Sequence, residues 1–291
     1  MPRLRLRTDE PMQNHTSFRV GGPADLMLLP RSVEELCQAL QFLGNQHLPV
    51  YIMGNGSNLL VRDGGFRGAV IKLGDNFNDV LVKDTQIWAQ AGISLAKLAH
   101  VAWQVSLAGL EFASGIPGTL GGAVAMNAGA YGREMADVIQ QVVCCDREGH
   151  LHYFSKGDLA LGYRTSRVRS DGHIVLEVEL QLEPGDQQVI KSEMEALNQL
   201  RREKQPLNFA SAGSTFKRPP GYYAGQLIDE AGLRGLAVGQ AQVSEKHCGF
   251  IINRGSATAS EILELINLVQ HRVWDKFRVK LELEVQVIGE D

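Results

Sequence analysis

Apolar residues recur with a helical period in segments spread along the whole chain. Ser32 and Ser94 stand where a helix cap is expected, just before two such segments. Thr258 and Glu261 form a capping box before another. The pattern therefore predicts helices at 33–43, 95–104, 187–204 and 223–231, and one that begins at 259.

Short apolar runs and alternating segments predict strands between these helices. The last of them, from Leu281 to Ile288, turns apolar residues to one face and Glu282, Glu284 and Gln286 to the other. Further strands are predicted at 49–53, 68–73, 79–83, 86–92, 138–145, 150–154 and 174–182. Before them, residues 14–28 begin as a polar turn with a glycine pair. No internal repeat is present.

One stretch, from Gly109 to Gly132, is dense in glycine and poor in charge. It reads GLEFASGIPGTLGGAVAMNAGAYG. Glycine costs chain entropy on folding and is used where a backbone turns sharply or approaches a ligand. Pro117 and Gly118 mark a turn, and the helix predicted to start at Thr119 would offer free N–H groups to a phosphate. The alternative is a tightly packed turn without a ligand.

A second glycine segment follows the strand predicted at 49–53. It reads Gly54-Asn55-Gly56-Ser57-Asn58-Leu59, and Asp75 lies about where a dinucleotide fingerprint would place its ribose-binding acid. Leu59 takes the place of the third glycine, however, and the next residues are too rich in turn formers for the helix that the fingerprint requires. We therefore predict a phosphate-contacting loop rather than a Rossmann unit, with a plain polar turn as the alternative.

Composition and charge narrow the classes of function. The chain has 291 residues, with 44% hydrophobic and 21% charged, which is typical of a globular protein of two or three domains. Its formal net charge is -4. Neither a basic excess nor a basic run is present, so nucleic acid and membrane surfaces are not expected partners.

The cysteines and the first residues indicate the cellular compartment in which the protein is expected to work. Cys37, Cys144, Cys145 and Cys248 include no CxxC pair, which argues against a metal site and a disulfide framework. The first residues have no apolar signal core, and no apolar run approaches the length of a membrane span. We expect a cytoplasmic protein without a bound metal.

The last third of the chain carries different chemistry. After the boundary at Pro184-Gly185-Asp186, the run SAGSTFKRPP at 211–220 places hydroxyls beside cations. Two glycine segments upstream suggest one long ligand with a diphosphate, and the cations suggest a second, anionic ligand. Each side chain also has a plain structural interpretation, as solvated surface for Lys217 and Arg218 or as a core histidine for His247.

Together these motifs resemble the UDP-N-acetylenolpyruvoylglucosamine reductase family, flavoenzymes of early peptidoglycan synthesis. The matching segments run in the family's order from about Asn14 to Gly289: NHTSFRVGGPADL, GNGSNLLV, GLEFASGIPGTLGGAVAMNAGAYG, GYRTS, GSTFKRP and LELEV. The glycine stretch alone would fit a wider class of FAD-binding domains. Its combination with the YR, GSTFKRP and LELEV motifs is much more specific.

The resemblance implies an α+β fold. It has a two-part FAD-binding domain of the PCMH, or vanillyl-alcohol-oxidase-like, type, followed by a C-terminal α+β substrate domain. The expected regions are 1–75 and 76–185 for FAD and 186–291 for substrate. The short stretch of chain between Arg164 and Ser214 resembles the family's short form, which lacks a tyrosine lid loop, so what closes the pocket stays open.

The resemblance also implies the reaction. NADPH reduces non-covalently bound FAD and leaves, and UDP-N-acetylglucosamine enolpyruvate then enters the same pocket. Flavin N5 gives hydride to its methylene carbon, and UDP-N-acetylmuramate forms. On this basis Arg164 clamps the carboxylate, Ser214 protonates the alpha carbon and Glu284 stabilises the enolate-like intermediate.

Further site residues follow from the same motifs. The flavin segments fall on Gly54, Asn55, Gly56, Ser57, Asn58 and Leu59, and on Gly115, Ile116, Pro117, Gly118, Thr119, Gly122, Ala123 and Asn127. The expected substrate contacts are Tyr163, Lys217, Arg218, His247 and Asn253, with Lys217 at the UDP diphosphate. No metal is expected, and the enzyme is expected to be a monomer.

Two other functions remain open. One is a different FAD-dependent oxidase or dehydrogenase on the same cofactor fold, which predicts no UDP dependence and no role for GSTFKRP. The other is a non-catalytic protein that binds flavin or a nucleotide sugar without turnover. The family often has proline where this chain has Leu283, but the alternation of the last strand keeps Glu284, rather than Glu282, as the catalytic candidate.

Overall fold

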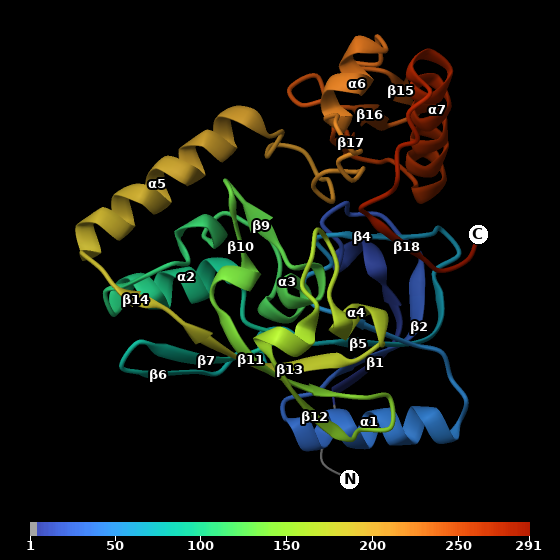
Figure 1. Cartoon of the computed structure of the whole chain (residues 1–291). Helices are drawn as coiled ribbons and strands as arrows, with labels where there is room; N and C mark the ends of the chain where they lie inside the picture. The colour runs from blue at the N-terminus through green and yellow to red at the C-terminus, as the bar shows by residue number, and fades with distance from the viewer. Residues whose placement is uncertain (1–4) are drawn as a thin grey trace. The chain divides into compact units, whose positions relative to one another are not determined.

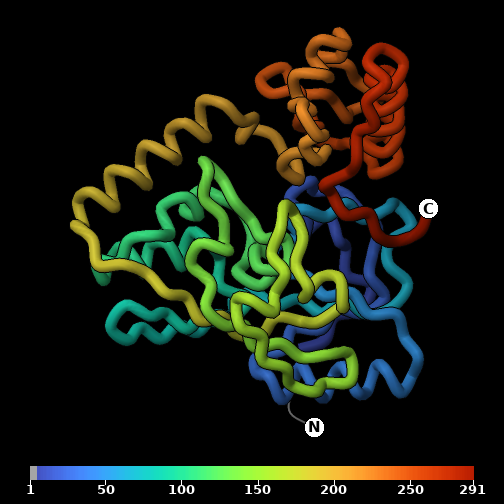
Figure 2. Tube along the Cα trace, in the orientation of Figure 1, coloured from blue at the N-terminus to red at the C-terminus, as the bar shows by residue number. Residues whose placement is uncertain are grey.

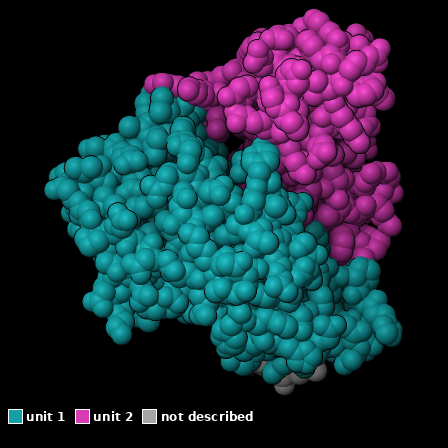
Figure 3. All heavy atoms as spheres, viewed as in Figure 1, with its two compact units in different colours: residues 1–7, 26–55, 68–201 teal, residues 8–25, 56–67, 202–291 magenta. Residues whose placement is uncertain are grey.

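The computed structural model describes residues 5–291, and the chain divides into two compact units (Figure 3). The first unit comprises the residues up to 7, residues 26–55 and residues 68–201. The second comprises residues 8–25, 56–67 and 202–291. Each unit therefore contains segments that are distant in the sequence, and each has its own hydrophobic core.

The first unit is built around a five-stranded antiparallel sheet with the order β12-β11-β13-β7-β6 (Figure 1). Its central strand, β13 (Ile174–Gln181), pairs with β11 (Ile139–Cys145) on one side and β7 (Gln86–Gln90) on the other. The outer strands are β12 (Leu151–Ser155) and β6 (Val80–Lys83). All five were predicted, to within a few residues, from their alternating or apolar patterns.

A four-stranded sheet lies near the N-terminus, in the order β1-β2-β5-β3. Its strands are β1 (Arg5–Pro11), β2 (Pro23–Leu29), β5 (Phe66–Lys72) and β3 (Val50–Met53), and β3 runs parallel to β5. The sequence pattern predicts β3 and β5 but neither β1 nor β2. Strand β1 is exposed along nearly its whole length, so it carries no apolar alternation that could have marked it.

The helices of the first unit begin at the caps that the sequence indicates. Ser32 caps α1 (Val33–Asn45) and Ser94 caps α2 (Leu95–Gln104), each accepting a hydrogen bond from the backbone N–H three residues on. The predicted apolar stripe of α2 is fully buried in the core. Both helices are therefore fixed by a local cap and by one buried face.

The second unit gathers its segments around α7 (Ala259–Phe277), whose stripe of isoleucine, leucine and valine residues is buried. The predicted capping box of Thr258 and Glu261 is present. Asp63 adds a cap from a distant segment, since its carboxylate accepts hydrogen bonds of 2.8 Å from the backbone N–H groups of Ala259 and Ser260. The other elements of the second unit are β4 (Leu59–Val61), α6 (Ala224–Glu230), β15 (Ala237–Val238), β16 (Ala241–Val243), β17 (Ile251–Asn253) and β18 (Gln286–Ile288).

The last strand is shorter than the prediction. Only β18 forms a ladder, a parallel pairing with β4 that joins the red and blue parts of the trace in Figure 2. Residues 281–285 form no ladder and make one isolated bridge, between Leu283 and Phe216. Alternation marks which side chains face the core, and Leu281 and Val285 are indeed buried. A ladder also needs a partner strand, which a single sequence does not reveal.

The remaining elements are short, apart from one long helix. They are β8 (Leu107–Ala108), α3 (Leu120–Met126), β9 (Gly129–Ala130), β10 (Arg133–Glu134), α4 (Arg167–Ser170), β14 (Glu183–Pro184) and α5 (Gln187–Lys204), with 3-10 turns at Met12–Asn14, Glu111–Ala113, Met135–Asp137 and Lys156–Leu159. Within residues 5–291, every helix is too short or too polar to cross a membrane.

Candidate functional site

The two glycine-rich segments meet inside the first unit. Gly54 follows strand β3, and Thr119 precedes helix α3. A Cβ atom on Gly54 would lie 2.1 Å from Oγ1 of Thr119 and 2.9 Å from its Cγ2. Thr119 is itself buried, with 3% of its surface exposed, so it has no room to withdraw. The contact therefore requires glycine at position 54 and places the first residue of one predicted flavin segment against Thr119 of the other.

The loop after β3 is not a dinucleotide fingerprint. Residues 54–58 connect β3 to another strand, β4, rather than to the helix that the fingerprint opens. This confirms the prediction against a Rossmann unit. Gly56 has a φ of +61°, in the left-handed region that glycine adopts at no steric cost. Leu59, the last predicted contact of this segment, is buried as the first residue of β4.

The start of helix α3 differs from the prediction. The N–H of Leu120 donates to the carbonyl of Ile93, and that of Gly121 to the carbonyl of Ala91, both at 2.8 Å. A Cβ on Gly121 would lie 2.9 Å from Cβ of Ala91, so this glycine is needed for close packing. The expectation of free N–H groups at this helix start is therefore wrong for these two groups, because the chain after β7 already uses them.

The remaining residues of the second flavin segment lie around this helix. Gly115, Ile116, Pro117 and Gly118 form the connection that precedes it, while Gly122 and Ala123 belong to the helix itself. A Cβ on Gly115 would lie 2.4 Å from Oδ1 of Asn198 on α5. Asn127 ends the helix in the left-handed region and is 1% exposed. The segment is thus tightly packed at Gly115 and Asn127, whereas Pro117 and Gly122 are exposed.

Tyr163 and Arg164 sit at the tip of a tight turn in the first unit. Gly162 and Thr165 exchange backbone hydrogen bonds of 3.1 and 3.2 Å across its base. Arg164 has a φ of +57°, an unfavourable conformation for a residue with a side chain. Its guanidinium lies 5.2 Å from the ring centre of Tyr163. Such an outlier persists only where the surroundings enforce it, and it often marks a functional residue.

Ser214 and Glu284 are brought together in the second unit by pairing of their segments. The N–H of Glu284 donates to the carbonyl of Thr215 at 3.0 Å, next to the bridge between Phe216 and Leu283. Thr215 is fully buried, and its hydroxyl accepts a 3.1 Å hydrogen bond from the N–H of Ile251. The sequence reasoning missed this anchoring role of Thr215, although its place beside Ser214 in the motif could have suggested it.

The hydroxyl of Ser214 has no hydrogen-bond partner among residues 5–291. A serine kept as a cap or turn former would bond a nearby backbone group. Its conformation is instead set by Gly213, whose φ is +75°, and by the buried Thr215. This arrangement removes the main support for the purely structural interpretation of Ser214.

The two glutamates of the last strand have different surroundings. Glu282 is exposed and pairs with Nζ of Lys217 at 3.3 Å. Glu284 is half-buried, and its carbonyl oxygen accepts a 3.0 Å hydrogen bond from Nδ2 of Asn58, in the first flavin segment. The difference in burial favours Glu284 over Glu282 as the functional residue, in agreement with the sequence register.

The other predicted substrate contacts are held in different ways. The guanidinium of Arg218 lies 3.9 Å from the ring centre of Tyr223. Nδ1 of His247 accepts a 3.1 Å hydrogen bond from the N–H of Gly249, and burial lowers the pKa of this histidine. Asn253 is buried, and its Oδ1 accepts hydrogen bonds from two backbone N–H groups of the following loop. The structure thus gives His247 and Asn253 scaffold roles, and their substrate contacts stay predictions.

Comparisons with known proteins extend this picture over the whole chain. Residues 24–155 match the family profile "FAD binding domain", and residues 205–288 match "UDP-N-acetylenolpyruvoylglucosamine reductase, C-terminal domain". The UDP-N-acetylenolpyruvoylglucosamine reductase of Clostridioides difficile strain 630 is 53% identical over 286 residues, which cover 98% of this chain and 94% of that protein. The chain belongs to the UDP-N-acetylenolpyruvoylglucosamine reductase family.

Other members of this reductase family also match the chain over nearly its whole length. The reductase of Alkaliphilus oremlandii is 50% identical over 291 residues, which cover 100% of this chain and 96% of that protein. The crystal structure of the Thermus caldophilus reductase has a TM-score of 0.83, with 38% identity and coverage of 99% of each chain. The FAD profile includes both glycine segments, and the reductase profile includes Ser214 and Glu284. The short form without a tyrosine lid stays a prediction.

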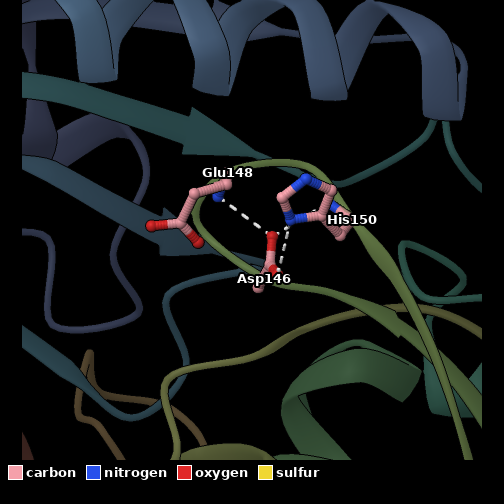
Figure 4. A group of neighbouring side chains, drawn as sticks. All are labelled: Asp146, Glu148 and His150. Atoms are coloured by element: carbon pink, nitrogen blue, oxygen red, sulfur yellow. Dashed lines mark hydrogen bonds and ion pairs between the residues drawn. The ribbon is translucent and has the colours of Figure 1, made fainter.

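One group of side chains in residues 5–291 has metal-ligand spacing. Ligand atoms of Asp146, Glu148 and His150 lie within 4.8 Å of one another, in the hairpin between β11 and β12 (Figure 4). The carboxylate of Asp146 is already engaged, since it accepts hydrogen bonds from the N–H groups of Glu148 and His150 at 3.0 and 2.8 Å. Nε2 of His152 lies 3.0 Å from it. These contacts identify the group as a hairpin turn.

This turn predicts a pH-dependent stability. The His152 side chain and the N–H of His150 hold the pKa of Asp146 well below its usual range. The charged carboxylate therefore stabilises the fold above about pH 4, and this contribution is lost as the pH falls through the folded-state pKa. In Asp146→Asn we expect the free energy of unfolding to fall by about 1 kcal/mol at pH 7 and by less at pH 3, with the loss decreasing further as the pH approaches the folded-state pKa, measured by urea denaturation.

The matched control for this turn is Glu148→Gln, which removes a neighbouring charge from an exposed side chain. We expect it to change the free energy of unfolding by less than about 0.5 kcal/mol at either pH. An equal loss in Asp146→Asn at both pH values would contradict the assignment.

The contact between Gly54 and Thr119 gives a sharper prediction. Gly54→Ala should destabilise the fold by about 1–3 kcal/mol through overpacking and weaken FAD binding by about tenfold or more. Denaturation and titration with FAD, followed by quenching of its fluorescence, measure the two effects. Thr119→Ala added to Gly54→Ala should restore part of the lost stability, because it removes the two nearest of the three side-chain atoms that the new Cβ would meet.

The control is Gly44→Ala, in the last turn of α1, where nothing lies within 4 Å of a new Cβ. That variant should keep FAD binding and gain up to about 1 kcal/mol, because alanine favours a helix over glycine. If Gly54→Ala behaved like Gly44→Ala, the close approach would not exist.

Proposed function

We propose that the chain reduces UDP-N-acetylglucosamine enolpyruvate to UDP-N-acetylmuramate, with NADPH as reductant, in peptidoglycan precursor synthesis. The observation that carries the proposal is the 53% identity to a named reductase over 98% of the chain. The FAD-binding profile over residues 24–155 and the close contact of Gly54 with Thr119 support FAD as the cofactor. When bound, FAD supplies the methylene carbon of the enolpyruvyl ether with a hydride that originates from NADPH.

Arg164 binds the carboxylate of the enolpyruvyl group. Addition of hydride to the methylene carbon leaves negative charge on the alpha carbon, which resonance spreads into this carboxylate. A fixed guanidinium stabilises that charge more than it stabilises the ground state, and such groups are worth about 100-fold to 1,000-fold in rate. The contact of this guanidinium with the ring of Tyr163 supports the role, because it restricts the positions that the Arg164 side chain can take.

Ser214 delivers the proton to the alpha carbon. A hydroxyl is a weak acid, but the carbanion it meets is far more basic, and Lys217 is three residues away on the same segment to stabilise the alkoxide. The hydroxyl has no partner among residues 5–291, so it is available for this transfer. Glu284, on the paired segment, stabilises the enolate-like intermediate by hydrogen bonding.

The proposed reductase can be distinguished from the two other functions that the sequence left open. A different FAD-dependent oxidase would have no use for the reductase-type C-terminal segment, which matches the family profile over residues 205–288. A non-catalytic binding protein would bind flavin or the nucleotide sugar without turnover, so turnover of the enolpyruvyl substrate distinguishes it from the proposed reductase. The proposal also includes a monomer that works in the cytoplasm, in keeping with the sequence expectations.

Spectroscopy and turnover of the purified protein test the function directly. We expect a yellow protein whose flavin is bleached by NADPH and regains its colour when UDP-N-acetylglucosamine enolpyruvate is added. Acid or heat should release all the flavin into the supernatant, as for non-covalent FAD. Flavin reduced by NADPH that is reoxidised only by oxygen, at a rate unaffected by the enolpyruvyl substrate, would refute the proposed reaction.

Stopped-flow measurement of the two half-reactions tests Ser214 and Glu284. In Ser214→Ala and Glu284→Gln we expect flavin reduction by NADPH to survive, because neither residue takes part in it. Oxidation of the reduced flavin by substrate should slow by about 100-fold or more, as for loss of a positioned acid or electrostatic group. The structural cost of Ser214→Ala should be small, since it removes no hydrogen bond among the described residues.

Glu282→Gln is the control for register. Its side chain is exposed, and its removal breaks only the surface ion pair with Lys217, so substrate oxidation should slow by less than about threefold. If Glu282→Gln carried the large effect instead, Glu284 would be the wrong glutamate. A near-normal rate in Ser214→Ala would assign the proton to water or another donor.

A further inference from the structure

Asn127, the last predicted contact of the second flavin segment, uses its carboxamide within the protein. It is 1% exposed, at the C-terminal end of α3. Its Oδ1 accepts a 2.9 Å hydrogen bond from the N–H of Ala136. Its Nδ2 donates a 3.2 Å hydrogen bond to the carbonyl of Gly162. The carboxamide therefore links the end of α3 to the base of the turn that carries Tyr163 and Arg164.

The conformation of Asn127 suits this link. Its φ is +42°, in the left-handed region, where asparagine is tolerated better than most residues with a side chain. The left-handed residue ends the helix, as glycine often does at this position. Glycine would satisfy that requirement without a side chain, so the ending of the helix alone does not explain an asparagine. Its two side-chain hydrogen bonds do.

The turn at Arg164 depends on support from the same helix end. Arg164 has a left-handed φ of +57°, which costs about 1 kcal/mol or more for a residue with a side chain. The hydroxyl of Ser166 donates to the carbonyl of Ala125 at 2.9 Å. Nη1 of Arg169 lies 2.9 Å from the sulfur of Met126 and donates to the carbonyl of Arg164. The bond from Asn127 reaches the base of the turn, at the carbonyl of Gly162.

We propose that Asn127 is a positioning residue for Arg164. Its Nδ2 fixes the carbonyl of Gly162, which holds the turn closed and keeps the guanidinium of Arg164 where the carboxylate of the substrate must be clamped. This inference rests on the proposed function for the role of Arg164 in the reaction. The link between Asn127 and the turn is independent of that function.

Asn127→Asp separates the two hydrogen bonds. The carboxylate can still accept from the N–H of Ala136, but it cannot donate to the carbonyl of Gly162. In the FAD-loaded protein we expect amide hydrogen exchange of a peptide covering 161–166 to speed up by about tenfold or more, because both bonds at the base of the turn loosen. Reoxidation of the reduced flavin by substrate should slow by about tenfold, while reduction by NADPH stays within about twofold.

A double-mutant cycle tests whether the effect passes through Arg164. Arg164→Gln alone should slow reoxidation by substrate by about 100-fold. Adding Asn127→Asp to Arg164→Gln should slow it by less than about twofold further, since the group being positioned is gone. If the two losses multiplied instead, Asn127 would act on the reaction by another route and the proposal would be overturned.

Gln181→Glu is the matched control in the same unit. It also exchanges a carboxamide for a carboxylate, and it removes donation to Oγ1 of Thr85 and the carbonyl of Leu182. We expect wild-type exchange at 161–166 and wild-type half-reactions. If Asn127→Asp does not fold, Asn127→Gly keeps the left-handed backbone and deletes the carboxamide, and it should give the same faster exchange. Wild-type exchange in that variant would overturn the link.

The experiment also separates this inference from the proposed function. If Arg164→Gln reoxidised at the wild-type rate, the carboxylate clamp of the proposed function would fail, whatever the exchange result. If Arg164→Gln were slow but Asn127→Asp left both exchange and reoxidation unchanged, the clamp would stand and the positioning role of Asn127 would fall.

Discussion

The contact between Gly54 and Thr119 is the constraint on which the cofactor side of the structure depends. A side chain at position 54 would overlap the hydroxyl of a threonine that is itself buried. The absence of that side chain lets the end of β3 touch the start of α3. It also explains why position 54 holds glycine at some cost in chain entropy, because the side chain of Thr119 occupies the space that a Cβ would need.

Backbone pairing orders the part of the second unit that carries Ser214 and Glu284. Thr215 is anchored on β17 through its hydroxyl, and its carbonyl accepts the N–H of Glu284. Two segments far apart in the sequence are thereby held side by side by backbone bonds, which do not depend on the identity of the exposed side chains. The pairing therefore does not depend on the side chains of Ser214 and Glu284, while those of Thr215 and Phe216 are buried.

The elements that could be predicted are those whose cause is local. Ser32, Ser94 and the box of Thr258 and Glu261 each fix a helix start through residues a few positions away. Strand β1 was missed because it is exposed and has no apolar alternation. Pairing partners are not local, so the last strand was predicted to be longer than it is. The prediction of free N–H groups at the start of α3 was wrong for the same reason, since these groups donate to the carbonyls of residues 91 and 93. The motifs gave the site candidates by resemblance, but their partners needed the structure.

Asn58 and Asn127, one in each glycine segment, supply directional hydrogen bonds that close packing alone does not provide. Glycine allows backbones to approach, but it adds no directional bond that would fix what lies beyond the contact. Asn58 donates to the carbonyl of Glu284, and Asn127 donates to the carbonyl of Gly162. Each carboxamide thus bonds to the backbone of a segment that carries a catalytic candidate. A segment suited to the cofactor can in this way also set the position of groups that meet the substrate.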